Sequence, residues 1–219
     1  MSLETLADVG HAGRMDRMYR YQRHIYDLTR KYYLFGRDTM IDGLDAGYGT
    51  RVLEVGCGTG RNMARIASLY PHAALYGLDI SAEMLTSARA TLRKAGRNDA
   101  VLTVADATDF TPRAFGTNGF DRIVISYALS MIPDWEAALD ASIAALAPGG
   151  SIHIADFGQQ EGLPSLARRL LTGWLTRFHV TPRATLFEAL KDRARANGAR
   201  LDFRTLGGGY AWLAVYRAA

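Results

Sequence analysis

Short apolar runs alternate with helical patterns through the middle of the chain. The predicted strands cover residues 52–55, 74–79, 101–105, 121–126 and 151–156. Between them lie three helical patterns, one that ends before Pro71, one that Ser81 can cap and one that begins near Pro133. Short β-branched strands that alternate with helices predict a parallel sheet with helices on both faces.

The end of the chain changes pattern. Residues 201–206 and 211–216 are apolar runs joined by three glycines at 207–209, which predicts a β-hairpin. About 40 residues before it predict two helices, the second from Thr181 to Gly198. In the first helix, large apolar residues recur every four positions, at Leu166, Leu170, Trp174 and Phe178. We expect this insertion to cover the carboxyl ends of the strands, where ligands bind in such sheets.

The N-terminal 49 residues predict a helical lid. Residues 14–34 have a helical pattern with Tyr19, Tyr26 and Tyr33 spaced at sevens, and a shorter helix is predicted from Arg37 to about Leu44. We therefore predict a single domain in four parts: the lid (1–49), a core (50–157), a helical insertion (158–198) and the hairpin (199–219).

Composition limits the classes of protein. The chain has 219 residues, 48% hydrophobic and 22% charged, which suits one substantial core. The single cysteine, Cys57, excludes an internal disulfide, and no secretory leader is visible. No run reaches the roughly 18 to 20 apolar residues that cross a bilayer. We expect a cytoplasmic protein whose membrane contact, if any, is peripheral.

Charge is distributed unevenly. Residues 38–159 carry 9 Lys and Arg against 14 Asp and Glu, whereas both ends are basic and the whole chain has a net charge of +4. Basic ends attract phosphates, whether of an anionic membrane or of nucleic acid. A solvated, Arg-rich surface without a partner accounts for them equally well.

Three glycines after the first predicted strand and an aspartate at the end of the second predict a nucleoside-binding site. Gly56, Gly58 and Gly60 follow the first strand, and Asp79 ends the second. Glycines let a backbone turn approach a ligand closely, and a carboxylate at the next strand tip can accept both ribose hydroxyls. A dinucleotide fingerprint has the spacing G-x-G-x-x-G, so the shorter spacing here favours a ligand without phosphates over NAD.

With Glu54 two residues before the first glycine, this segment resembles motif I of the class I S-adenosylmethionine-dependent methyltransferases. The resemblance covers residues 50–157. It implies a Rossmann-like α/β fold with a seven-stranded, mostly parallel sheet and an antiparallel last strand. It also implies S-adenosylmethionine as the cofactor, S-adenosylhomocysteine as the product, Asp79 as the ribose-binding acid, and no metal.

Further candidates follow the strand tips. Met84 can pack on an adenine face, and Asp106 can accept the adenine amino group, although a core methionine and a loop aspartate are the plain alternatives. Glu54 can hold the glycine turn or serve only the structure. The candidate cofactor-binding residues are Tyr26, Arg30, Glu54, Gly56, Cys57, Gly58, Gly60, Asp79, Ile80, Met84, Asp106, Ala107 and Ser126.

The segment 19–38 is the most distinctive stretch outside the core. It is similar to the same region of the methyltransferases that build betaine lipids, which implies N-methylation of diacylglyceryl homoserine to the trimethylhomoserine lipid. A Tyr-Asp pair at this place, here Tyr26-Asp27, is also found in phosphatidylethanolamine and quinone methyltransferases. These acceptors, and other small molecules, therefore remain alternatives.

An amine acceptor agrees with the aromatic residues. The methylated product is a cation that aromatic rings such as Tyr26, Tyr127 or Phe157 can accommodate. The candidate catalytic residues are Tyr26, Tyr127 and Asp156, of which a phenol or carboxylate can relay the released proton to water. Arg30 can pair with the methionine carboxylate of the cofactor. Ordinary packing explains the tyrosine stripe as well.

Other functional classes are weaker. No RNA-binding module accompanies the core, so nucleic acid is not an expected partner. A regulatory subunit that binds S-adenosylmethionine without catalysis is the non-enzyme alternative. The amphipathic first helix of the insertion, with its arginines, has the composition of an interfacial helix, so we expect peripheral contact with an anionic membrane surface. The oligomeric state is not predicted.

Overall fold

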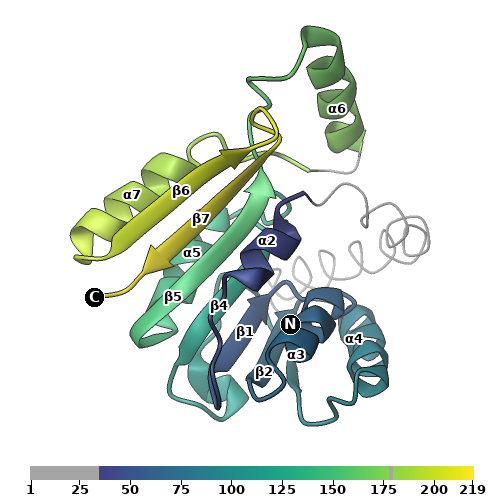
Figure 1. Cartoon of the computed structure of the whole chain (residues 1–219), viewed down its shortest axis with the longest axis vertical. Helices are drawn as coiled ribbons and strands as arrows, with labels where there is room; N and C mark the ends of the chain where they lie inside the picture. The colour runs from purple at the N-terminus through teal and green to yellow at the C-terminus, as the bar shows by residue number, and fades with distance from the viewer. Residues whose placement is uncertain (1–34, 178–179) are drawn as a thin grey trace, which may run out of the picture.

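A computed structural model describes residues 35–177 and 180–219, and its centre is a seven-stranded sheet (Figure 1). The strand order is β3-β2-β1-β4-β5-β7-β6. The strands are β1 (Arg51–Val55), β2 (Ala74–Asp79), β3 (Val101–Val104), β4 (Phe120–Ser126), β5 (Leu146–Phe157), β6 (Arg200–Leu206) and β7 (Ala211–Arg217). The first five are parallel, and β7 is antiparallel to both of its neighbours. The predicted fold class and hairpin are confirmed.

Helices cover both faces of this sheet. They are α2 (Arg37–Asp42), α3 (Arg61–Leu69), α4 (Ala82–Lys94), α5 (Trp135–Ala144), α6 (Ser165–Arg177) and α7 (Leu186–Ala196), with a 3-10 turn, η1, at Pro112–Phe115. Successive strand residues point to opposite faces and form two separate cores. One core packs against α2, α3 and α4, and the other against α5 and α7.

The order of the strands creates a crevice. From β1 the chain proceeds outward to β2 and β3, then returns to β4 on the other side of β1. The connections after β1 and β4 therefore leave in opposite directions at the carboxyl ends of adjacent strands. Ligands of open α/β sheets bind at such a switch point.

Two predicted boundaries are corrected by the structure. The helix expected near Pro133 begins at Trp135, because the side chain of Asp134 caps it by accepting a hydrogen bond from the amide of Ala137 at 3.3 Å. The fifth strand is longer than predicted, since Leu146 already pairs with Phe120 before a register shift.

The two helices of the insertion do different things. The second was expected from Thr181 over the carboxyl ends of the strands, but α7 begins at Leu186 and lies along the sheet beside β6 (Figure 1). Its buried face, Leu186, Leu190 and Ala194, belongs to the core of that side of the sheet. Only α6 extends beyond the end of the sheet.

Several predictions lie outside the described residues. The helix predicted over 14–34, with Tyr19, Tyr26 and Arg30, is among them, as is Phe178. The division of the chain into four parts stays a prediction. Among the residues that the structure describes, no helix combines the length and apolar character needed to span a membrane.

Candidate active site

A cavity of about 280 Å³ opens at the carboxyl ends of β1 to β4. Four connections that are far apart in sequence contribute to it, one after each of these strands. The lining residues are Gly56, Gly58, Leu78, Asp79, Ile80, Met84, Ala105, Asp106, Ala107, Thr108, Tyr127, Ala128, Met131, Ile132, Pro133 and Asp134. The switch point of the sheet is thus hollow and is lined largely by apolar side chains.

The glycine turn is formed by backbone conformations that other residues adopt with strain. Gly56, Gly58 and Gly60 have φ angles of 68°, 53° and 74°. Gly60 precedes α3, and a Cβ there would lie 3.0 Å from the Cβ of Ala88. A Cβ on Gly56 would lie 3.0 Å from that of Ala128. The glycines therefore let β1 turn into α3 while leaving backbone, not side chain, at the cavity.

Asp79 connects the second strand to this turn. One of its carboxylate oxygens accepts a hydrogen bond from the amide of Gly58 at 2.8 Å, and the other accepts from the amide of Ser81 at 2.9 Å. Asp79 also lines the cavity, and a carboxylate oxygen can accept more than one hydrogen bond. Asp79 is therefore oriented by the protein and able to accept hydroxyl groups of a ligand.

The third strand places Asp106 and Ala107 at the cavity. Asp106 is exposed, and its Oδ1 accepts hydrogen bonds from both the amide and the hydroxyl of Thr108 at 2.8 Å. Ile80 and Met84, which follow Asp79, add apolar lining. A flat, partly apolar group with hydrogen-bond donors on its edge, such as adenine, suits this combination.

Four candidate cofactor residues are not among the lining residues of the cavity: Glu54, Cys57, Gly60 and Ser126. Glu54 is buried in β1 and accepts a hydrogen bond from the side-chain amide of Asn62 at 2.6 Å. Cys57 is buried, and burial is the largest cause that raises the pKa of its thiol. The contact of these four residues with a cofactor stays a prediction.

Tyr127 lines the cavity but its hydroxyl is engaged elsewhere. The phenol donates a hydrogen bond to the backbone carbonyl of Phe35 at 2.6 Å, and the backbone has a φ of 54°. The ring is buried and meets Phe157 edge-on, with 4.6 Å between ring centroids. Burial, and then the charge of Asp156, raise the pKa of the phenol far above its usual value. Tyr127 therefore stays protonated and fixes the start of its loop.

Asp156 is buried beside the same loop. Its carboxylate accepts hydrogen bonds from the amides of Ser130 at 3.1 Å and Phe157 at 2.8 Å. Burial raises the pKa of Asp156 to about 6, although these hydrogen bonds and the charge of Arg183 favour the ionised form. Asp156 is not among the lining residues, so the catalytic role predicted for it requires contact through a neighbouring group.

Sequence reasoning missed much of the cavity wall. The loop after β4 supplies Ala128, Met131, Ile132, Pro133 and Asp134. The only signal in the sequence was its position, directly after a predicted strand that ends at the switch point. Two candidates, Tyr26 and Arg30, lie outside the described residues.

Comparison with known proteins agrees with this geometry. Residues 52–150 match the family model described as "Methyltransferase domain". The fold is that of the class I methyltransferases. Among solved structures, the plantazolicin methyltransferase BpumL, in complex with a monoazolic desmethylPZN analogue and SAH, superposes with a TM-score of 0.71 over 98% of both chains at 13% identity. The DhpI–SAH complex has a TM-score of 0.64 at 21% identity, covering 92% of this chain and 93% of DhpI.

The curated proteins that are similar in sequence to this chain differ in the acceptors that their names give. Methyltransferase GfsG of Streptomyces halstedii is 30% identical over 139 residues, which is 64% of this chain and 49% of GfsG. The demethylmenaquinone methyltransferase of Anoxybacillus flavithermus is 27% identical, covering 68% of this chain and 58% of that protein. Phosphoethanolamine N-methyltransferase 1 of Triticum aestivum is 33% identical, covering 57% and 24%. The chain thus spans about half the length, or less, of most of these relatives.

Proposed function

We propose that this protein is an S-adenosylmethionine-dependent methyltransferase. The observation that supports it most is the cavity at the switch point, where the glycine turn and Asp79 meet. Structural neighbours that contain S-adenosylhomocysteine share the fold. When bound, S-adenosylmethionine supplies an electrophilic methyl group that an acceptor attacks by in-line displacement, leaving S-adenosylhomocysteine.

The residues of the chain bind and orient rather than react. Asp79 accepts the ribose hydroxyls, and Asp106 with Ala107 faces the adenine edge. The apolar lining excludes water, so that the acceptor meets the methyl group at contact distance, which supplies much of the acceleration in such transfers. Tyr26 and Asp156 remain the proposed proton relays, since Tyr127 stays protonated and donates its hydroxyl hydrogen to Phe35. Asp156, with a pKa of about 6, is matched to accept a proton near neutral pH.

Calorimetric titration with S-adenosylhomocysteine and with NAD tests the cofactor. We expect micromolar or tighter binding of S-adenosylhomocysteine and none of NAD. Asp79→Asn serves as the site variant and Asp99→Asn as the matched control, because Asp99 forms only a surface ion pair with Arg97. Binding of NAD without S-adenosylhomocysteine would overturn the assignment.

For the acceptor, we propose the amino group of a lipid head group, as in the conversion of diacylglyceryl homoserine to its trimethylated betaine lipid. The support is the similarity of segment 19–38 to betaine-lipid methyltransferases and the presence of an N-methyltransferase among the relatives. Small-molecule, quinone or phosphatidylethanolamine methylation is the alternative, since a demethylmenaquinone methyltransferase is also among the relatives. A regulatory subunit that binds the cofactor without turnover is the alternative outside the enzymes.

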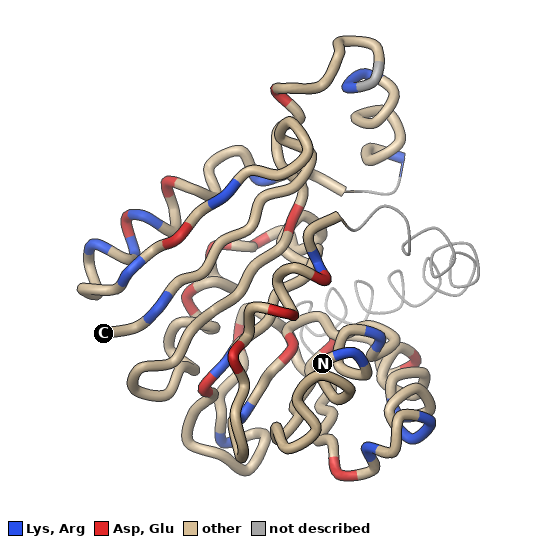
Figure 2. Tube along the Cα trace, in the orientation of Figure 1, with Lys and Arg blue, Asp and Glu red and all other residues tan. Residues whose placement is uncertain are grey.

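The surface of α6 supports a lipid acceptor. Leu166 and Leu170 are each 69% exposed, whereas Leu175, on the opposite side, is buried. The helix carries Arg168, Arg169 and Arg177 and no acidic residue (Figure 2). Exposed leucines beside arginines suit the interface of an anionic leaflet. We propose that α6 rests peripherally on the cytoplasmic face of a membrane.

Two assays separate these possibilities. Co-sedimentation of the full chain with phosphatidylglycerol-containing vesicles should fall in Leu166→Glu but not in Leu69→Glu, which places the same charge on an exposed leucine of α3. Equal binding of all three proteins, or no salt-sensitive binding, would contradict the membrane proposal. Transfer of labelled methyl to a lipid extract, compared with a quinone, then identifies the acceptor class, and absence of turnover with any acceptor would favour the binding subunit.

A further inference from the structure

The loop after β4 is a cavity wall that lacks regular secondary structure. Residues 127–134 contribute six lining residues, more than any other connection. Within the loop, the amides of Met131 and Ile132 both donate to the carbonyl of Ala128, at 2.9 and 3.1 Å. This single turn leaves the carbonyls of Leu129, Ser130 and Ile132 without partners in the loop itself.

The connection between α6 and α7 supplies those partners. The guanidinium of Arg183 donates from Nε to the carbonyl of Leu129 at 2.9 Å and from Nη2 to that of Ile132 at 2.5 Å. The amide of Thr181 donates to the carbonyl of Ser130 at 2.9 Å. One side chain and one amide, from a segment about 50 residues away, thus hold three carbonyls of the wall.

The same turn is held from its other side. The amide of Ser130 donates to the carboxylate of Asp156, which is fully buried at the end of β5. Leu129 and Ser130 are buried as well, at 0% and 1% exposure. Buried carbonyls that lose a partner are costly, because no water replaces it. The position of the wall therefore depends on the guanidinium of Arg183. Among these partners, it is the one that a side-chain substitution can remove while the carboxylate of Asp156 stays in place.

We propose that Arg183 is a positioning residue for the cofactor cavity. Its guanidinium bridges two carbonyls and keeps Met131 and Ile132 at the cavity, although it is not itself a lining residue. This inference rests on the proposed function, because it assumes that the cavity binds S-adenosylmethionine. If the wall occupies its described position in only a tenth of the molecules, the apparent dissociation constant rises about tenfold.

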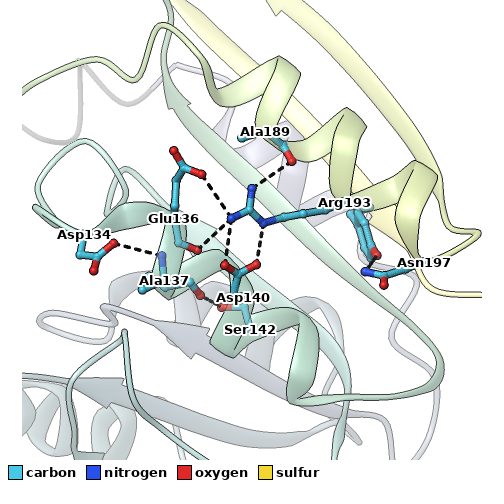
Figure 3. A network of polar contacts seen from close by, with 10 residues as sticks. Asp134, Glu136, Ala137, Asp140, Ser142, Ala189, Arg193 and Asn197 are labelled. Carbon is cyan, nitrogen blue, oxygen red and sulfur yellow. Dashed lines mark hydrogen bonds and ion pairs between the residues drawn. The ribbon is translucent and has the colours of Figure 1, made fainter.

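A second, mostly buried arginine provides the matched control. Arg193 on α7 joins two acidic residues of α5, with Nε 2.6 Å from Asp140 and Nη2 3.3 Å from Glu136 (Figure 3). It also donates to the carbonyl of Ala189 at 3.2 Å. Arg193 thus has more polar contacts than Arg183, but none of the residues that it contacts lines the cavity.

The experiment compares Arg183→Met, Arg183→Lys and Arg193→Met in the full chain. Thermal unfolding, S-adenosylhomocysteine affinity and hydrogen exchange of the Met131 and Ile132 amides are measured for each. We expect both methionine variants to lower the melting temperature, but only Arg183→Met to weaken binding about tenfold and to speed exchange at the two amides. Arg183→Lys should recover part of the affinity, since an ammonium reaches one carbonyl and not both.

Two results would overturn the proposal: affinity in Arg183→Met within twofold of the wild type, or an equal loss in Arg193→Met. If the wild type binds no S-adenosylhomocysteine, the proposed function fails, and hydrogen exchange alone then tests whether Arg183 positions the wall. Unchanged exchange at Met131 and Ile132 in Arg183→Met would overturn the positioning role whatever the cavity binds.

Discussion

Two buried groups on β5 should give the stability of this protein opposing responses to acid. Burial raises the pKa of Asp156 from 3.8 to about 6, and burial, followed by the charges of Arg122 and Arg217, lowers the pKa of His153 from 6.5 to about 4. The two side chains are three positions apart on one strand, so they point to opposite faces of the sheet. They share no hydrogen-bond partner, and their effects should add.

The signs follow from proton binding. Between pH 6 and 3.8 the folded state binds a proton at Asp156 that the unfolded state releases, so stability rises as the pH falls. Between pH 6.5 and 4 the unfolded state binds a proton at His153 that the folded state refuses, so stability falls. At about 1.4 kcal/mol per pKa unit, each effect amounts to about 3 kcal/mol, and the two nearly cancel.

Single variants should therefore reveal the pH dependence of stability that each residue causes and that the other residue offsets in the wild type. In Asp156→Asn, which leaves only His153 of this pair to titrate, the free energy of unfolding should drop by about 3 kcal/mol relative to the wild type between pH 7 and 4. In His153→Gln, which keeps a hydrogen-bonding group for the hydroxyl of Ser151, it should rise by about the same amount. Urea unfolding at pH 7, 5.5 and 4 measures both. Changes of the same sign in the two variants, each measured relative to the wild type, would refute the reasoning.

Further substitutions test the glycine turn, the acid and the phenol. Gly60→Ala should lower the free energy of unfolding by about 1 to 2 kcal/mol for its φ of 74°, and by more for the contact with Ala88. Gly96→Ala, with a φ of 75° and open space around the new Cβ, should show only the first loss. Equal melting temperatures of the two variants would contradict the close approach of Gly60 to Ala88. Asp79→Asn should weaken S-adenosylhomocysteine binding at least tenfold in calorimetry, and unchanged affinity would remove Asp79 from the site. Tyr127→Phe should lower the free energy of unfolding by about 1 kcal/mol in urea titration, and a neutral result would mean that its hydrogen bond to a backbone carbonyl adds nothing.

Local chemistry made the strand tips readable from the sequence. The glycine spacing 56-58-60 and the acid Asp79 act through backbone conformation and one carboxylate, and both are properties of residues within a short stretch. The period of the apolar runs gave the strands and the fold class for the same reason, because side-chain alternation and helix periodicity are local.

What the tertiary structure decided were contacts between segments distant in the chain. No local pattern shows that Arg183 reaches the carbonyls of Leu129 and Ile132, or that α7 lies against β6 instead of over the cavity. Nor does the sequence reveal that the hydroxyl of Tyr127 is used by Phe35. Hydrophobic periodicity determines which face of an element is buried, but the partner of a polar side chain depends on which loops the packed sheet brings together, and that is settled only when the whole chain has folded.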